Sequence, residues 1–188
     1  MKRVFVKNMV CDRCKMVVKN EFEKLNLVVG SVFLGEVEVI AGNFMSVRDI
    51  LDERLKDFGF KLLDDEFEIT NNRIKSSLID YVETSDVLSN RKLSEYISER
   101  LNKDYITLSK LFSKMNGITI EKYLIKLKIE KAKQLIQENK LNFSEIAYLL
   151  GYSNLSHLSS QFKKNEKVSL TKYKLTNTSN RKSFDKIL

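Results

Sequence analysis

The apolar residues in the first part of the chain change their spacing several times. Val4 and Val6 lie two residues apart, which indicates a short strand, and residues 12–25 then place apolar side chains at helical spacing. Residues 28–34 and 36–40 alternate again, as the two strands of a β-hairpin do. This stretch therefore predicts a strand, a helix and a hairpin in succession.

A second helical stripe follows over residues 47–58 and stops at Gly59. Residues 60–67 are then expected to be extended. The order strand-helix-strand-strand-helix-strand predicts that residues 1–69 form an α+β domain of the ferredoxin-like (βαββαβ) type.

Strand patterns are not found from residue 70 onward, and apolar residues recur at helical spacing instead. The predicted helices cover residues 74–82, 93–101, 108–115, 120–138, 142–150, 155–164 and 170–175. We expect residues 70–90 to be a connecting helix, residues 91–178 to be an all-α domain, and residues 179–188 to be a basic C-terminal tail. The longest helix, over 120–138, has apolar residues on two sides, as a helix between two subdomains requires.

Polar residues mark several of the expected helix ends. Asn142 with Glu145 three residues later is typical of a capping box, and Asn154 is a suitable N-cap for the helix that follows. Gly117 and Gly151 are expected to end the helices before them.

Residues 94–123 resemble residues 144–173 when the chain is compared with itself at an offset of 50. The identical pairs are Ser94 and Ser144, Glu95 and Glu145, Leu108 and Leu158, Ser109 and Ser159, Phe112 and Phe162, Lys114 and Lys164, Lys122 and Lys172, and Tyr123 and Tyr173. Each copy consists of a short helix, a turn and a second helix, so the repeat predicts two helix-turn-helix units.

Such units bind duplex DNA with the first helix across the phosphate backbone and the second in the major groove. Successive major-groove faces lie roughly 34 Å apart. The helix between the two copies would span roughly 28 Å at 1.5 Å per residue, which suits a rigid spacer. A monomer could thus contact two half-sites.

The second copy carries the sequence FSEIAYLLGYSNLSHLSSQFKK over residues 143–164, and the first ends with LSKLFSKMNGITIEKY over residues 108–123. Both segments resemble the double helix-turn-helix domain of AraC/XylS-family transcription regulators, and the resemblance covers about residues 72–176. The family usually has Gly and Pro where this chain has Lys167 and Leu170.

The resemblance implies a DNA-binding transcription regulator that contacts promoter DNA through two recognition helices. It places on their exposed starts Tyr105, Ile106, Thr107, Ser109 and Lys110, and then Asn154, Leu155, Ser156, Ser159 and Ser160. Hydroxyl groups and the apolar Ile106 and Leu155 would meet base edges, with Lys110, Asn154 and DNA shape adding specificity. We expect phosphate contacts from Lys114, Lys163 and Lys164, although each lysine could instead only solvate a helix end.

Charge is distributed unevenly between the two predicted domains. The whole chain has a formal net charge of +8, but residues 1–70 hold 11 Lys+Arg and 13 Asp+Glu, net −2, and residues 71–188 hold 22 and 12, net +10. A mildly acidic domain joined to an anion-binding domain has this balance. The chain has one histidine, His157, with no catalytic partner in sight, so we expect no enzyme and a packing role for His157 on the inward shoulder of its helix.

The two cysteines of the chain, Cys11 and Cys14, lie between the first predicted strand and helix. The surrounding domain resembles the heavy-metal-associated domain of copper chaperones and transport ATPases, whose Gly-Met-x-Cys-x-x-Cys motif is matched except that Asn8 replaces Gly. The resemblance implies a thiolate site for Cu(I) or Zn. The alternative is that the cysteines are remnants and that the domain mediates dimerisation or binds another ligand.

Two functions remain open at this stage. The first is an AraC/XylS-type regulator whose N-terminal domain senses a metal or another signal or mediates assembly, with RNA polymerase and a second copy of the chain as further partners. The second is a copper-type metallochaperone or a thiol redox protein that uses Cys11 and Cys14. No apolar stretch is long enough for a membrane span and the first residues do not suit a signal peptide, so we expect a cytoplasmic protein without membrane contact.

Overall fold

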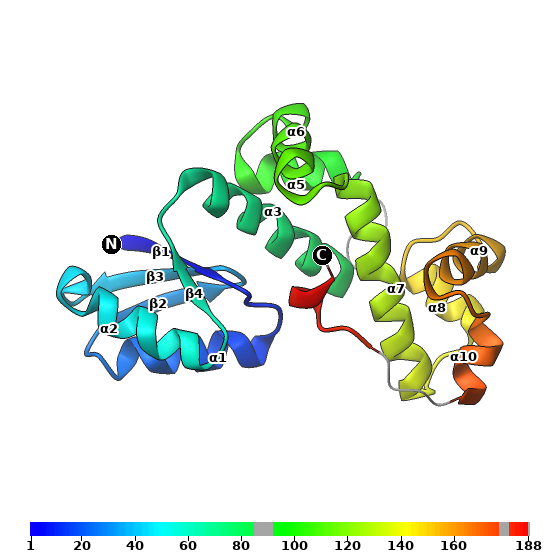
Figure 1. Cartoon of the computed structure of the whole chain (residues 1–188), viewed down its shortest axis with the longest axis horizontal. Coiled ribbons are helices and arrows are strands. Elements are labelled where there is room, and N and C mark those ends of the chain that lie inside the picture. The colour runs from blue at the N-terminus through cyan, green and yellow to red at the C-terminus, as the bar shows by residue number, and fades with distance from the viewer. Residues whose placement is uncertain (85–91, 177–180, 188) are drawn as a thin grey trace. The chain divides into compact units, whose positions relative to one another are not determined.

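The chain forms two compact units, Met1–Ser77 and Leu78–Leu188, each with its own core. The computed structural model describes residues 1–84, 92–176 and 181–187 (Figure 1). The units divide inside helix α3, Glu66–Glu83, beyond the domain end at residue 69 that the sequence suggested. Of the described helices, none combines the length and the apolar character that crossing a membrane requires.

Unit 1 contains a four-stranded antiparallel sheet. Before α3 its elements are β1 (Lys2–Lys7), α1 (Asp12–Glu23), β2 (Val28–Phe33), β3 (Glu36–Ala41), α2 (Phe44–Asp57) and β4 (Lys61–Leu63). The strands lie in the order β2-β3-β1-β4, and every neighbouring pair is antiparallel. In the β1–β3 pair Val4 lies opposite Val37, so the two inner strands bury valines on the same face.

Helices α1 and α2 cover that face of the sheet (Figure 1). The core between the layers consists of side chains that are at most 5% exposed: Val4, Val6, Val18, Phe22, Val37, Val39, Leu51, Leu55, Leu62 and Leu63. The alternation of apolar residues in the strands and their helical spacing in α1 and α2 therefore converge on one core.

The prediction that residues 60–67 are extended is wrong beyond Leu63. Helix α3 begins at Glu66, and Phe67 lies in its first turn with 65% of its surface exposed. The Asp65 carboxylate accepts a hydrogen bond from the Glu68 N–H at 2.8 Å and so caps the new helix. The acidic residues of the first turn, Glu66 and Glu68, also interact favourably with the helix dipole. Together with the cap, this interaction favours a helix over the strand that the apolar pattern predicted.

Unit 2 is helical and is built around one long helix, α7 (Ile120–Glu138). Figure 1 shows α5 and α6 toward one end of α7 and α8, α9 and α10 along its other end. The bounds are α5 (Leu93–Leu101), α6 (Tyr105–Asn116), α8 (Phe143–Leu149), α9 (Leu155–Glu166) and α10 (Leu170–Thr176). The predicted segment 70–90 is helical as far as Glu83, and its residues 85–90 lie outside the described residues.

The repeat at an offset of 50 is confirmed in the positions of the helices. Helices α6 and α9 begin and end 50 residues apart, and so do the starts of α7 and α10. The ring centroids of Phe112 and Tyr123 lie 5.5 Å apart, and those of Phe162 and Tyr173 lie 5.4 Å apart. The same aromatic pair therefore joins the second helix of each unit to the helix that follows.

Lys167 ends α9 in the left-handed conformation that Gly117 adopts at the end of α6. Their φ angles are 62° and 70°, and each N–H donates to the carbonyl four residues earlier. Leu170 is buried where Ile120 is buried in the first copy. The two departures from the family pattern thus preserve the turn, with the lysine in a backbone region that favours glycine.

An ion-pair network centred on a buried lysine joins α7 to α9. Lys133, with a side chain 1% exposed, places its Nζ 2.8 Å from an Oε1 of Glu130 and 3.2 Å from an Oε2 of Glu166. The second oxygen of Glu130 accepts the Lys182 N–H at 2.9 Å. The segment expected to be a basic tail is therefore attached to α7, and it buries Ile187 beyond a short 3-10 turn, Phe184–Lys186.

Replacing Lys167 with glycine should stabilise unit 2. Glycine adopts a positive φ without the steric cost that a lysine bears, so we expect Lys167→Gly to raise the free energy of unfolding by roughly 0.5–1 kcal/mol. Urea unfolding followed by circular dichroism measures the change. The matched variant Lys163→Gly lies inside α9 and should lower stability by about 1 kcal/mol; a destabilised Lys167→Gly would contradict the strained turn.

Removing the cation of the buried network should be strongly destabilising. In Lys133→Met the buried carboxylate of Glu130 and the partly buried one of Glu166 lose their ammonium partner, and we expect the free energy of unfolding to fall by about 3–5 kcal/mol. Glu166→Gln should lower the free energy of unfolding by less, because Lys133 keeps its ion pair with Glu130. Urea unfolding tests both variants against Lys140→Met, an exposed control expected to change stability by less than about 0.5 kcal/mol. Equal effects of Lys133→Met and the control would contradict a structural role for the network.

Candidate nucleic-acid interface

Helix α9 is held in place by caps on both sides of a tight turn. Asn142 and Glu145 form the predicted capping box at the start of α8, and Gly151 has a φ of 66° in the turn that follows. Asn154 then caps α9, with its Oδ1 accepting the His157 N–H at 2.9 Å. Leu158 and Phe162 are buried, which fixes the face that α9 turns outward.

The outward face of α9 consists mainly of small polar groups. Asn154, Ser156 and Ser160 are exposed, Leu155 is 36% exposed, and Ser159 is half-buried. Because the Asn154 oxygen is engaged in the cap, the amide nitrogen is the part of this side chain left for an external partner. The five predicted residues are thus accessible, with Ser159 at the edge of the face.

His157 is exposed, so the prediction that it packs on the inward shoulder of its helix is wrong. The buried Leu158 and Phe162 set the rotation of α9, and this rotation leaves His157 facing outward. Its Nδ1 lies 3.4 Å from Ser153 Oγ and its Nε2 3.4 Å from Gln161 Nε2, while its ring meets Tyr152 edge-on. At the offset of 50 His157 aligns with Thr107, which was predicted to be exposed. The repeat could therefore have indicated that His157 is exposed too.

Helix α6 presents a comparable face in the first unit. Asp104 caps it by accepting the Thr107 N–H at 3.0 Å, and Leu108 and Phe112 are buried. Ile106 is 62% exposed, and Thr107 and Lys110 are also exposed. Ser109 is half-buried, as Ser159 is in α9.

Two residues of α6 differ from their expected places. Tyr105 is only half-exposed, and its hydroxyl donates to Glu121 Oε1 at 2.6 Å; burial and this carboxylate raise the pKa of Tyr105. The hydroxyl bond in turn lowers the pKa of Glu121. Tyr105 therefore ties α6 to α7. Met115, the last residue of the predicted helix over residues 108–115, is 40% exposed in the last turn, beyond the buried Phe112.

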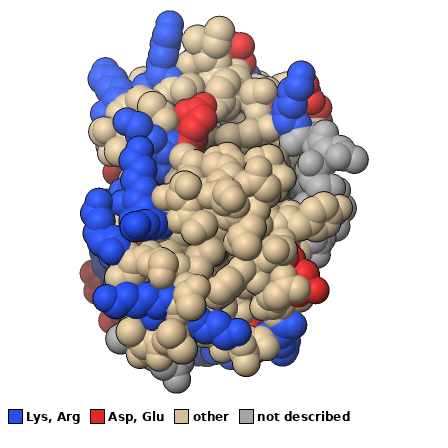
Figure 2. Space-filling view, turned by 90° about the vertical axis from the view of Figure 1, so that its right-hand side faces the viewer, with Lys and Arg blue, Asp and Glu red and all other residues tan. Residues whose placement is uncertain are grey.

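Lysines flank these uncharged faces. Lys110, Lys114, Lys163 and Lys164 are exposed, and within the described ranges none of the four forms an ion pair with a carboxylate. Figure 2 views the chain from the side of α8–α10 and shows Lys and Arg side chains along the edge of a broad uncharged area. The uncharged faces of α6 and α9 are thus bordered by positive charge, as binding to a polyanion requires.

A cation also lies behind the turn between α8 and α9. The Lys128 Nζ is 5.2 Å from the centre of the Tyr152 ring, and burial lowers the pKa of this lysine. Burial also raises the pKa of Tyr152 to about 12. The stacked pair supports the turn that precedes α9.

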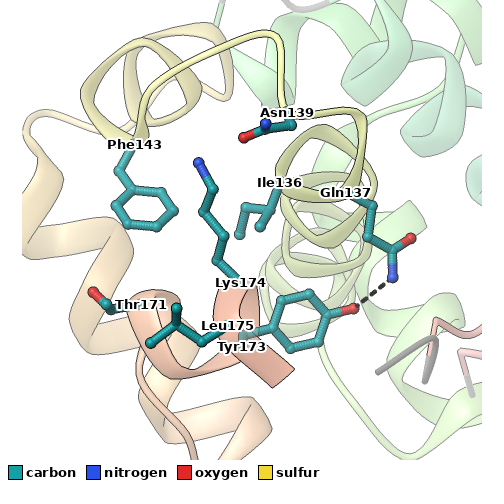
Figure 3. A pocket seen from close by; sticks show the side chains of 8 residues that line it. All are labelled: Ile136, Gln137, Asn139, Phe143, Thr171, Tyr173, Lys174 and Leu175. Atoms are coloured by element: carbon teal, nitrogen blue, oxygen red, sulfur yellow. Dashed lines mark hydrogen bonds between the residues drawn. The ribbon is translucent and has the colours of Figure 1, made fainter. Parts of the chain in front are cut away.

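A separate hollow of about 530 Å³ lies between the end of α7, the start of α8 and α10 (Figure 3). Gln137 Nε2 donates to the Tyr173 hydroxyl at 3.2 Å, and Lys174 Nζ lies 5.8 Å from the centre of the Phe143 ring. The predicted interface residues are not among its lining residues: Ile136, Gln137, Asn139, Phe143, Thr171, Tyr173, Lys174 and Leu175.

The two cysteines lie together at the start of α1. Asn8 adopts a φ of 72°, a conformation that asparagine tolerates where the resembling motif has glycine, and Met9 is buried beneath the loop. Cys11 is the exposed N-cap residue, and its Sγ lies 3.3 Å from that of half-buried Cys14. Burial raises the pKa of Cys14, which favours the thiol over the thiolate.

This donor set suits one kind of metal ion only. In the part of the chain that the structure describes, no group of three or more His, Cys, Asp or Glu could hold a metal. Two adjacent sulfurs match a soft monovalent ion with two ligands, such as Cu(I). A tetrahedral zinc site would need further ligands from outside the described residues.

Comparisons with known proteins agree with the geometry of unit 2. A family described as "Helix-turn-helix domain" matches residues 97–175. The chain is 28% identical over 102 residues to the HTH-type transcriptional activator RhaS of Escherichia coli O9:H4 (strain HS), a match that covers 48% of this chain and 37% of RhaS. In the E. coli strains E24377A and SE11 the matched part of RhaS is 24% of its length, so the chain spans well under half of these relatives.

Among solved structures, the C-terminal domain of AraT, a response regulator from Geobacillus stearothermophilus, is similar to this chain. The two are 28% identical with a TM-score of 0.50, and the match covers 63% of this chain and 95% of the AraT domain. RhaS is described as a transcriptional activator and AraT as a response regulator, which agrees with the sequence-based expectation of a regulator. With its two capped and repeated units, the segment over residues 97–175 is a helix-turn-helix domain.

Proposed function

We propose that this chain is a sequence-specific, DNA-binding transcription regulator of the AraC/XylS type. The observation that carries the proposal is the pair of recognition helices, α6 and α9, which repeat at an offset of 50 residues with the same caps, the same buried positions and accessible first turns. Their position on either side of α7 supports insertion into successive major grooves of one duplex.

Specificity in this proposal comes from weak contacts and DNA shape. Ile106 and Leu155 offer apolar contact to thymine methyl groups, while Thr107, Ser156 and Ser160 offer hydroxyl groups that accept or donate. Lys110 and the free amide of Asn154 add direct contacts, and His157 joins the face beside them. Ser109 and Ser159 lie at its edge, and Tyr105 acts chiefly by holding α6.

Affinity comes from phosphate contacts of Lys114, Lys163 and Lys164. These lysines lie in the last turns of α6 and α9, beyond the residues proposed to meet bases. Each phosphate that a lysine neutralises releases counterions, so binding should weaken as salt concentration rises. A promoter regulator of this kind works in the cytoplasm, with RNA polymerase as a further partner.

The N-terminal unit is proposed to be a ferredoxin-like domain that senses a signal or mediates assembly, including dimerisation. Its strand order β2-β3-β1-β4 with two helices on one face supports that fold. The adjacent thiols of Cys11 and Cys14 support Cu(I) as the signal, since two soft ligands suffice for this ion. A metallochaperone or thiol redox role for the same pair is the alternative.

Removing the phosphate-contacting charges should reduce DNA binding in a salt-dependent manner. In the full chain we expect Lys163→Gln with Lys164→Gln to weaken binding to its preferred genomic fragment and to reduce the slope of log affinity against log salt by about 2. Fluorescence anisotropy across a salt series measures both quantities. Lys140→Gln with Lys172→Gln is the control with the same change of net charge. The proposed regulator function would be overturned if the full chain bound no genomic fragment in a salt-sensitive, sequence-preferring way.

Cu(I) should bind the N-terminal unit through both cysteines and alter DNA affinity. Competition with a chromogenic Cu(I) chelator should show one ion bound by the full chain and none by Cys11→Ser with Cys14→Ser, since this variant lacks both soft ligands. Anisotropy with and without Cu(I) then measures the change in DNA affinity. Tight binding of Cu(I) without an effect on DNA would favour the chaperone alternative, and no binding would overturn the metal site.

A further inference from the structure

A second cavity in unit 2, of about 240 Å³, lies between the two helix-turn-helix units. The turn after α6 and the first half of α7 form one wall, and the last turns of α9 form the other. The lining residues are Ile118, Lys122, Ile125, Lys126, Gln161, Lys164 and Asn165. Both repeats therefore contribute to a single small cavity.

The cavity combines an apolar floor with a cationic rim. Ile118 and Ile125 are half-buried, while the ammonium groups belong to Lys122, Lys126 and Lys164. Aspartate and glutamate are missing from the lining, and within the described residues none of these three lysines pairs with a carboxylate. The Lys126 Nζ has a carbonyl partner, Ile187 O, at 3.4 Å.

Gln161 supplies a polar group that lacks a partner. Its Oε1 is buried and makes no hydrogen bond among the described residues, although a buried amide oxygen normally does. The Nε2 of the same amide lies 3.4 Å from His157 Nε2. Reversal of the amide would place an N–H donor at the orphaned position and an acceptor facing His157.

We propose that this cavity binds a small carboxylate with a compact apolar body. The lysines would attract the carboxylate, Gln161 would donate to it after reversal of its amide, and the two isoleucines would cover the apolar body. A DNA phosphate would use the charges but leave the isoleucine floor in water. The combination of both features therefore favours an amphipathic anion over a bare phosphate.

Binding there would be coupled to DNA recognition, a step that rests on the proposed function. A ligand between Ile118 and Gln161 contacts both units and restrains α9 relative to α7. Reversal of the amide also changes the group that Gln161 turns toward His157 on the outward face, from the present Nε2 to Oε1. By linkage, a ligand that changes DNA affinity must bind more or less tightly itself when DNA is present.

The test uses the full chain without DNA and 4-tert-butylbenzoate as the probe. Two-dimensional 15N NMR titration should shift the amide signals of Ile118, Ile125, Gln161 and Asn165. The neutral 4-tert-butylbenzamide and the small anion acetate should each bind at least about tenfold more weakly, because each lacks one of the two recognised features.

Two kinds of variant separate the charge from the cavity. Lys122→Gln with Lys126→Gln should weaken benzoate binding about tenfold, while Ile125→Phe should weaken it by filling the floor and keeping the charges. Lys140→Gln with Lys172→Gln is the control with the same change of net charge. Circular dichroism verifies that each variant is folded.

Three results would overturn the cavity as a carboxylate site: equal binding of the benzamide, shifts confined to other surfaces such as the hollow of Figure 3, or unchanged binding in both variants. If the probe fails to bind but Lys122→Gln with Lys126→Gln lowers the salt dependence of DNA binding, the lysines contact phosphate instead. Probe binding that leaves DNA affinity unchanged would overturn the coupling alone. Because the titration contains no DNA, its outcome is independent of the regulator proposal.

Discussion

The buried ammonium group of Lys133 determines how the second half of unit 2 is assembled. It lies on α7 and bonds to Glu130 of the same helix and to Glu166 near the end of α9, with almost no exposure to water. Buried charges tolerate little displacement, because each lost contact leaves an unpaired ion in a low-dielectric interior. The network therefore fixes the position of α9 along α7, and it attaches the C-terminal segment through the Lys182 N–H.

The N-caps and the buried residues of α6 and α9 determine which faces of these two helices point outward. Asp104 and Asn154 start α6 and α9 at equivalent residues, and Leu108 and Leu158 then face the core four residues later. Neither helix is long enough to be stable alone, so its rotation depends on that buried stripe and on the aromatic pair beneath it. The side chains available to a partner follow from these few constraints.

Much of this arrangement could be predicted from the sequence because it depends on local patterns. The repeat, the capping box at Asn142 and the burial of Phe112 and Phe162 all follow from spacing. The errors arose where tertiary contacts or a competing cap decided the outcome. The Asp65 cap converted an apolar, strand-like segment into helix, and the buried Leu158 and Phe162 orient α9 so that His157 faces outward. Spacing alone gives no sign of the partners that Lys133 and Tyr105 find across helices.

The structure shows which positive charges of the basic half are paired internally and which remain beside α6 and α9. Several cations of the basic half are neutralised internally, as Lys131 is by Glu83 and Lys133 by two glutamates, and these contribute nothing to an external anion. The cations that remain beside α6 and α9 surround hydroxyl and aliphatic side chains rather than arginines that could pair with guanine. A surface with that composition gains affinity from charge and discriminates through fit, so the exact placement of α9 on α7 matters more for recognition than any single contact.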